Sequence, residues 1–155
     1  FISDSFLQFW FLFVYPNRYE LERGKTEKVM EKISAEVVPR YLSFVYEEIC
    51  RELFWDLCDL GDIAFSPVKV GLFWDKSVEI DVAAVDADGN LFFGECKYHS
   101  GKKPVDMRVL DALEEKARKA GFTDDSVLFG LFSDSGFAED VNLTKAVLVN
   151  QTEVV

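Results

Sequence analysis

Two apolar segments joined by a tight turn, residues 77–86 and 90–98, constrain the fold of this chain more than any other feature. Their two-residue periodicity predicts β-strands, and the intervening Ala87-Asp88-Gly89 predicts a hairpin with a three-residue loop. Gly89 supplies the left-handed conformation that such a loop requires. With this loop, Asp81 is expected to lie directly opposite Glu95.

Four charged side chains interrupt these apolar strands. Opposed residues share one face of a sheet, so Glu79 should face Lys97 on the same side as the pair of Asp81 and Glu95. The reverse face is expected to belong to the core, through Ile80, Val82, Ala84, Phe92, Gly94 and Cys96.

The pairing of Asp81 with Glu95 predicts a metal site. Two carboxylates about 5 Å apart at Cβ destabilise a sheet unless a cation or a shared proton separates them. Mg²⁺ (or Mn²⁺) takes one or two protein carboxylates, keeps several waters and accepts a phosphate oxygen from a substrate. Lys97 is expected to orient or deprotonate an attacking water and to neutralise charge in the transition state. These roles suit the hydrolysis of a phosphodiester bond.

The rest of the sequence predicts helices around a mixed sheet. Apolar residues at helical spacing predict one helix from Glu27 to a break near Pro39 and a second helix that stops near Gly61. The segments that follow predict three strands, a helix closed by Gly121 and two more strands, at residues 66–75, 77–86, 90–98, 104–122, 126–133 and 145–150. A short helix is one alternative for the segment between the last two strands. This order implies an α/β fold with helices on both faces of the sheet.

The charge of the chain limits where a nucleic acid could bind. The net charge is −11, with 17 basic and 28 acidic residues, and this opposes nonspecific binding of a polyanion. Residues 97–119 are the exception, because seven basic residues there outnumber four acidic ones. We therefore expect DNA or RNA to approach this segment and to contact Lys102, Lys103 and Arg108.

Residues 1–26 form an aromatic-rich lead-in. The apolar run from Phe6 to Pro16 is too short for the roughly 20 residues that span a bilayer, and the following Pro, Asn and Gly residues predict a turn or linker. The chain opens on Phe1 and not on Met, so we expect a piece of a longer polypeptide in which this run packs against another part. Three cysteines indicate no disulfide framework, which favours the cytoplasm.

The aspartate in "VEIDVAAV" followed by the Glu-x-Lys of "FFGECKY" resembles the signature of the PD-(D/E)XK nuclease superfamily. Together with "FLQFWFLFVYPNR", "FVYEEICREL" and "LFSDSGF", it resembles the C-terminal domain of archaeal and bacterial STAND-type AAA+ ATPases. The resemblance implies a restriction-endonuclease-like fold, with an α-β-β-β-α-β core, for residues 27–155. It also implies that residues 1–26 join this domain to upstream ATPase and winged-helix domains. Residues 1–155 contain no Walker loop, so ATP is not expected to bind them.

The resemblance also assigns roles to individual residues. It implies that Asp81, Glu95 and Glu47 hold the metal and that Lys97 supports the hydrolytic water. Glu79 and Lys116 are supporting residues, the latter on the helix after the site. One departure is Ile80, which stands where the superfamily has a proline.

Ordinary ion pairs could also explain some of these charged residues. Glu79 and Lys97 could form only a cross-strand ion pair, and Glu47 could pair with Arg51 one helical turn away. Three functions therefore stay open: a Mg²⁺-dependent endonuclease, a regulatory domain that retains the nuclease fold without turnover, and a nucleic-acid-binding module without cleavage. Assembly into a homo-oligomer is also left open.

Overall fold

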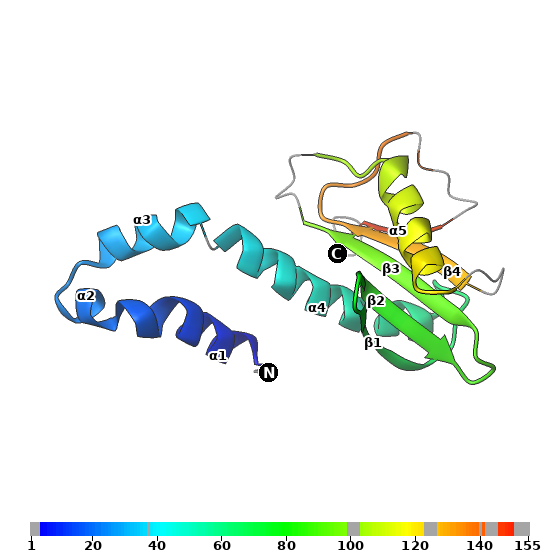
Figure 1. Cartoon of the computed structure of the whole chain (residues 1–155), viewed down its shortest axis with the longest axis horizontal. Helices are drawn as coiled ribbons and strands as arrows, with labels where there is room; N and C mark the ends of the chain where they lie inside the picture. Colours follow the sequence, from blue (N-terminus) through cyan, green and yellow to red (C-terminus); the bar gives the residue numbers. More distant parts are fainter. Residues whose placement is uncertain are drawn as a thin grey trace. The chain divides into compact units, whose positions relative to one another are not determined.

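A computed structural model describes residues 4–36, 38–98, 103–122, 127–139, 141 and 146–150. The chain divides into two compact units, Phe1–Val45 and Tyr46–Val155 (Figure 1). The division falls inside helix α4 (Val38–Leu60), whereas the expected domain begins at residue 27.

The first unit consists of helices. The lead-in is helical from residue 5 to residue 22, as α1 (Ser5–Phe9), a π-helical turn η1 (Trp10–Val14), a 3₁₀ turn η2 (Tyr15–Asn17) and α2 (Arg18–Glu22). The predicted turn is found at Gly24, which has a φ of 72° and donates its N–H to the Leu21 carbonyl. Pro16 lies inside the helical stretch, in its 3₁₀ turn, so the predicted turn is confined to the end of the segment.

Helix α3 (Thr26–Glu36) completes this unit with the first turns of α4. Phe13, Val29 and Ile33 form its small buried core. Many other aromatic residues of the lead-in are exposed. Among the described residues, no helix combines the length and the apolar character needed to cross a membrane.

The second unit is built on a five-stranded mixed sheet in the order β1-β2-β3-β4-β5. The strands β1 (Pro67–Asp75), β2 (Val78–Asp86) and β3 (Leu91–Lys97) are antiparallel neighbours. The strands β4 (Val127–Ser133) and β5 (Val147–Asn150) extend the sheet in parallel beyond β3. Helix α5 (Met107–Lys119) connects β3 to β4. The predicted α-β-β-β-α-β core, a mixed sheet with helices, is therefore confirmed.

The segment between β4 and β5 contains no helix in residues 134–139. Phe137 instead makes a parallel bridge to Val105, and two backbone hydrogen bonds flank this bridge. Residues 140 and 142–145 lie outside the described part of the chain.

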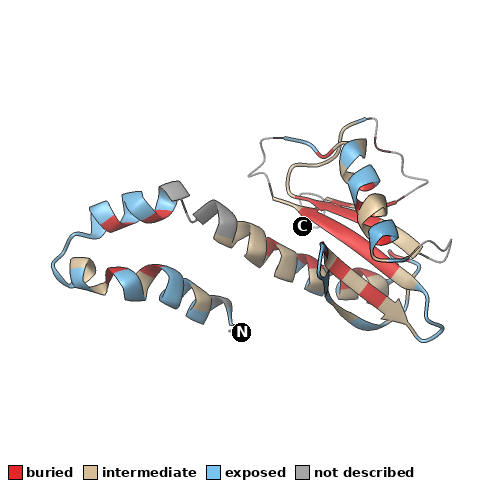
Figure 2. Cartoon of the chain, in the orientation of Figure 1, coloured by how far each residue is buried: buried red, intermediate tan, exposed pale blue. Residues whose placement is uncertain are grey.

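Each face of the sheet has its own core. The C-terminal part of α4 places Cys50, Phe54 and Leu57 on one face, against Val82 and Phe92. On the other face α5 contributes Leu110, Leu113 and Ala117, packed with Ile80, Phe93 and Leu131. Figure 2 shows that β3, between these layers, is buried along most of its length.

The predicted hairpin loop is confirmed. The Asp86 N–H donates to the Asn90 carbonyl at 3.1 Å, Gly89 has a φ of 85°, and Val82 pairs with Gly94 as expected. The Asp86 carboxylate also accepts hydrogen bonds from the backbone N–H groups of Asp88 and Asn90, at 2.9 and 2.8 Å. This loop sets the register of β2 against β3.

The expected alternation along β2 is interrupted. Gly71 of β1 pairs with Ala83, but Phe73 pairs with Ile80, so two residues of β2 stand opposite the single residue Leu72. Such a bulge changes the face to which side chains point. Val82 packs in the α4 cluster while Ile80 packs in the α5 cluster. The prediction that Ile80 and Val82 share a face was therefore wrong, and the single face predicted for all four charges fails for the same reason.

Two paired glycines make room for one phenyl ring. Gly94 of β3 pairs with Gly130 of β4, and the Phe92 ring lies over both. A Cβ atom added at Gly130 would come within 2.4 Å of the Phe92 Cζ. The ring has little freedom to move, because it also stacks on Phe54 with ring centroids 4.2 Å apart.

We predict that Gly130→Ala lowers the free energy of unfolding by about 1–3 kcal/mol, since the new methyl group overpacks this layer. Gly71→Ala on the edge strand should change it by less than about 0.5 kcal/mol, because a Cβ there meets no atom within 4 Å. Urea denaturation followed by circular dichroism measures both variants. Equal midpoints for the two variants would contradict this description of the core.

Candidate active site

Asp81 lies where β2 and β3 separate. The described pairing of the two strands ends at Val82 and Gly94. Beyond that point, the Cys96 N–H donates to the Asp81 Oδ2 at 2.8 Å, so a side-chain carboxylate replaces the backbone acceptor of a regular ladder. The Asp81 carbonyl accepts a hydrogen bond of 2.8 Å from Arg51 Nη1 of α4. The carboxylate and the backbone carbonyl of Asp81 are thereby both held in place.

Glu95 is a buried carboxylate with two lysine partners. It is only 7% exposed, on the central strand β3. Its Oε1 accepts a hydrogen bond from Lys97 Nζ at 2.8 Å, and its Oε2 accepts one from Lys116 Nζ of α5 at 2.6 Å. These ion pairs offset the cost of burying the charge. Lys97 thus pairs with Glu95. The alternative of a cross-strand ion pair between Lys97 and Glu79 is not observed in the described part of the chain.

The carboxylates of this region repel one another. Burial raises the pKa of Asp81, and the charge of Glu95 raises it further, while the Cys96 N–H, Lys116 and Lys97 act in the opposite direction. Burial also raises the pKa of Glu47 to about 7, with Asp81 as the next cause and Arg51 opposing it. The fields of carboxylates on α4, β2 and β3 therefore overlap.

Lys97 keeps its proton in this environment. Burial by itself would lower the pKa of Lys97, but the neighbouring charges of Glu95 and Asp81 outweigh this effect and raise the pKa overall. An ammonium group of raised pKa is a poor proton acceptor near pH 7. A protonated Lys97 suits the predicted neutralisation of charge in the transition state.

The donor set has the chemistry of a hard-cation site. Asp81 and Glu95 offer carboxylate oxygens, which Mg²⁺ and Mn²⁺ prefer, and one or two such ligands are enough when water completes the shell. Within the described residues, no three acidic, His or Cys side chains are grouped closely enough to hold an ion, so Glu47 is not gathered with the other two. A cation bound at Glu95 would compete with Lys97 or Lys116 for the same oxygens.

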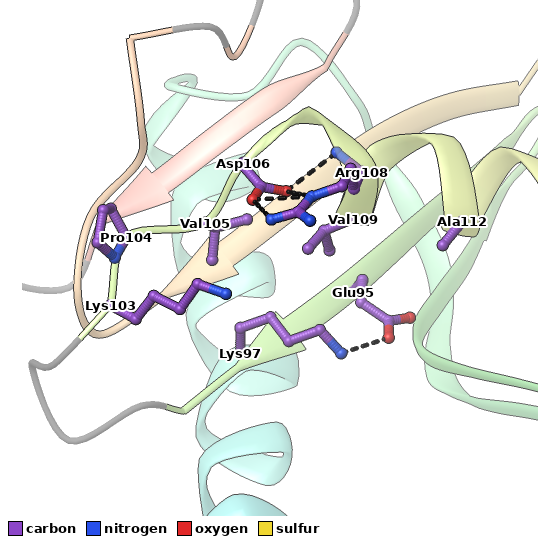
Figure 3. A pocket seen from close by; sticks show the side chains of 9 residues that line it. All are labelled: Glu95, Lys97, Lys103, Pro104, Val105, Asp106, Arg108, Val109 and Ala112. Carbon is purple, nitrogen blue, oxygen red and sulfur yellow. Dashed lines mark hydrogen bonds and ion pairs between the residues drawn. The ribbon is translucent and has the colours of Figure 1, made fainter.

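The residues predicted to bind nucleic acid lie partly beside this site. Lys103 and Arg108 line a cavity that also contains Glu95 and Lys97 (Figure 3). Lys102 lies outside the described residues. Glu79 is exposed on β2, and it contributes to the raised pKa of Glu47.

Sequence reasoning missed the function of Arg51. Its spacing from Glu47 allowed an ion pair along the helix as an alternative, whereas its guanidinium group donates a hydrogen bond to the Asp81 carbonyl. The contact of Lys116 with Glu95 joins residues 21 positions apart, and no local pattern in the sequence reveals it.

A family model matches residues 10–117, more than half of the chain. The family, DUF234, is described as archaeal and bacterial proteins of unknown function. The chain belongs to this family. The part of this DUF234 chain that matches includes Glu47, Asp81, Glu95, Lys97 and Lys116.

Individual proteins resemble parts of the DUF234 chain. The uncharacterized protein MJECL04 of Methanocaldococcus jannaschii is 30% identical over 125 residues, which are 80% of this chain and 28% of that protein. The chain thus spans little more than a quarter of that relative's length. Among solved structures, a repair endonuclease from Pyrococcus abyssi is similar with 18% identity, 57% and 37% coverage and a TM-score of 0.41. An EndoMS–double-stranded DNA complex is similar with 22% identity, 55% and 35% coverage and a TM-score of 0.35.

We predict that the Glu47 carboxyl group titrates near pH 7, above the ordinary value of 4.5, and that Asp81→Asn lowers its pKa. Removal of the negative charge on Asp81 makes ionisation of Glu47 easier, while burial keeps part of the shift. Carbon-13 NMR of the side-chain carboxyl groups measures this titration. Asp88→Asn, in the exposed hairpin loop, is the control and should leave the Glu47 pKa unchanged. A Glu47 pKa near 4.5 in the unmodified chain would contradict the electrostatics described above.

Proposed function

We propose that this DUF234 chain is a metal-dependent nuclease domain, which hydrolyses phosphodiester bonds of DNA or RNA with Mg²⁺ or Mn²⁺. One observation carries the proposal. Burial and the charge of Glu95 both raise the pKa of Asp81, and the ammonium group of Lys97 bonds Glu95 at 2.8 Å, so both carboxylates and this lysine interact. This arrangement supports the roles that the PD-(D/E)XK resemblance implies.

Asp81 and Glu95 would hold the metal, with Glu47 nearby. When bound, the metal would polarise the phosphodiester and favour ionisation of a water molecule. Asp81 is positioned for this task by the Cys96 N–H and by Arg51, which limit its movement. Lys97, which stays protonated, neutralises negative charge that grows on the phosphate oxygens. Lys116 orients Glu95 from the opposite side.

A second function has one specific observation in its favour. Both oxygens of Glu95 are already bonded to lysines, so the cluster is satisfied without a metal. A regulatory domain that retains the fold but does not cleave would require only these ion pairs between Glu95 and the two lysines. The net charge of −11 also suits such a domain better than a DNA-cleaving enzyme.

The larger context is part of the proposal. The relative from Methanocaldococcus jannaschii extends well beyond the part that this chain matches. We infer that the chain acts as one domain of a longer cytoplasmic polypeptide, joined to ATPase and winged-helix domains.

We predict nicking of supercoiled plasmid DNA or cleavage of single-stranded DNA or RNA in Mg²⁺ or Mn²⁺, and none in EDTA. Asp81→Asn and Lys97→Met should each lower the rate by about 10²–10³-fold, since each removes a group that acts on the developing charge. Asp88→Asn and Lys119→Ala are the matched controls, because they remove the same charges from exposed positions away from the site. Gel electrophoresis of the products measures the rates.

Equal cleavage by wild type and both site variants would exclude this site as the source of activity. If wild type cleaves none of these substrates with either metal, the regulatory function becomes the better account.

A further inference from the structure

A cavity of about 380 Å³ lies beside the candidate active site, between the end of β3 and the first turns of α5 (Figure 3). Glu95 and Lys97 belong to both the site and the cavity. The other lining residues come from the segment before α5 and from α5 itself: Lys103, Pro104, Val105, Asp106, Arg108, Val109 and Ala112. Cavities of roughly 300–1,000 Å³ are typical of small-molecule sites.

The cavity has a positive charge in an acidic chain. Lys97, Lys103 and Arg108 line it, against the two carboxylates Glu95 and Asp106. Lys116 also bonds Glu95, so that carboxylate is neutralised from two sides. Because the whole chain has a net charge of −11, this local excess of cations is unusual and favours an anionic ligand.

Arg108 is paired with Asp106. Its Nε donates to both oxygens of Asp106 at 3.1 Å, and its Nη2 bonds Asp106 Oδ2. Asp106 is in turn fixed as the N-cap of α5, where its Oδ1 accepts the Arg108 backbone N–H at 3.1 Å. The Arg108 side chain is 80% exposed in this pair, so a phosphate from solvent can reach its guanidinium group.

The remaining wall of the cavity is apolar. Pro104, Val105, Val109 and Ala112 contribute it. The backbone of Val105 is anchored by hydrogen bonds to Gly136 and Ala138, at 2.9 and 2.8 Å, so this wall has a defined position. An apolar wall does not stabilise a bare phosphate ion, whereas it can contact the sugar and base of a nucleotide.

We propose that this cavity binds one nucleotide of a single polynucleotide strand, with its phosphate at Lys103 and Arg108 and its sugar and base against Pro104 and Val109. The position of this nucleotide relative to the cleaved bond rests on the proposed nuclease function. Since the cavity shares Glu95 and Lys97 with the active site, the bound nucleotide is adjacent to the phosphodiester that is hydrolysed.

Binding is measured without cleavage, in EDTA, by fluorescence anisotropy of a labelled single-stranded pentanucleotide. Lys103→Ala and Arg108→Ala should each weaken binding by about 3–10-fold and reduce the slope of log affinity against log salt by about 0.7, the value for one phosphate contact on a single strand. Lys119→Ala removes the same charge from the far end of α5, where Lys119 pairs with Glu115, and should leave the slope unchanged.

A second variant tests the shape of the cavity without a change in charge. Ala112 is exposed at the cavity wall, so Ala112→Phe fills the space and should be compatible with folding. It should weaken binding of the pentanucleotide at least 5-fold. Affinity equal to wild type in Ala112→Phe and in both charge variants would overturn the proposal.

Three small probes identify the ligand chemistry: a deoxynucleoside 5′-monophosphate, inorganic phosphate and an unphosphorylated deoxynucleoside. Methyl-detected NMR should show the largest shifts at Val109 and Ala112 with the monophosphate. If inorganic phosphate binds as tightly as the monophosphate, the cavity is only an anion site and the nucleotide assignment is wrong. If none of the three probes shifts these methyl signals, the nucleotide assignment is also wrong.

The two proposals fail separately. If Asp81→Asn abolishes cleavage while the cavity variants bind normally, the nuclease function stands and the nucleotide cavity is wrong. If wild type does not cleave but the cavity variants lose binding of the pentanucleotide and the monophosphate, the nuclease function is wrong and the cavity remains a nucleotide site.

Discussion

The hydrogen bond from the Cys96 N–H to the Asp81 carboxylate is the interaction on which the candidate site depends. It occurs one residue beyond the last described pair of β2 and β3, and next to the bulge that β2 makes against β1. A regular strand would direct Asp81 to one face of the sheet and close the ladder with a backbone carbonyl. Beside the bulge, where the described pairing ends, the carboxylate instead accepts the Cys96 N–H, and the charges of Glu95 on β3 and Lys116 on α5 act on it.

The charges around Asp81 follow from that placement. Carboxylates brought together in a partly buried region raise one another's pKa values, as Asp81 and Glu47 illustrate. Two lysines from different elements meet the same carboxylate, Glu95, and stabilise it. The result is a compact arrangement of opposite charges over a rigid sheet, whose central strand is packed on both faces. Such preorganised charge suits catalysis on a phosphodiester, and it also explains why the cluster can exist without a ligand.

Much of this arrangement could be predicted from the sequence, because local signals specify it. The Gly89 turn fixed the hairpin register, and helical periodicity located α4 and α5. The face of Ile80 could not be predicted, since the bulge depends on the pairing of β2 with β1 rather than on any residue pattern within β2. The contact of Lys116 with Glu95 and the fit of Phe92 over Gly130 are likewise tertiary. The helical lead-in was obscured by Pro16 and Asn17, which are usual in turns but are accommodated here by a 3₁₀ turn.

Binding of Mn²⁺ to the chain, followed by electron paramagnetic resonance of the free ion, tests the central claim most directly, because it requires no knowledge of the substrate. The account predicts one saturable site per chain that is lost in Asp81→Asn and in Glu95→Gln and is retained in Asp88→Asn. Equal Mn²⁺ binding in wild type and in both site variants would contradict the claim that these two carboxylates form the metal site.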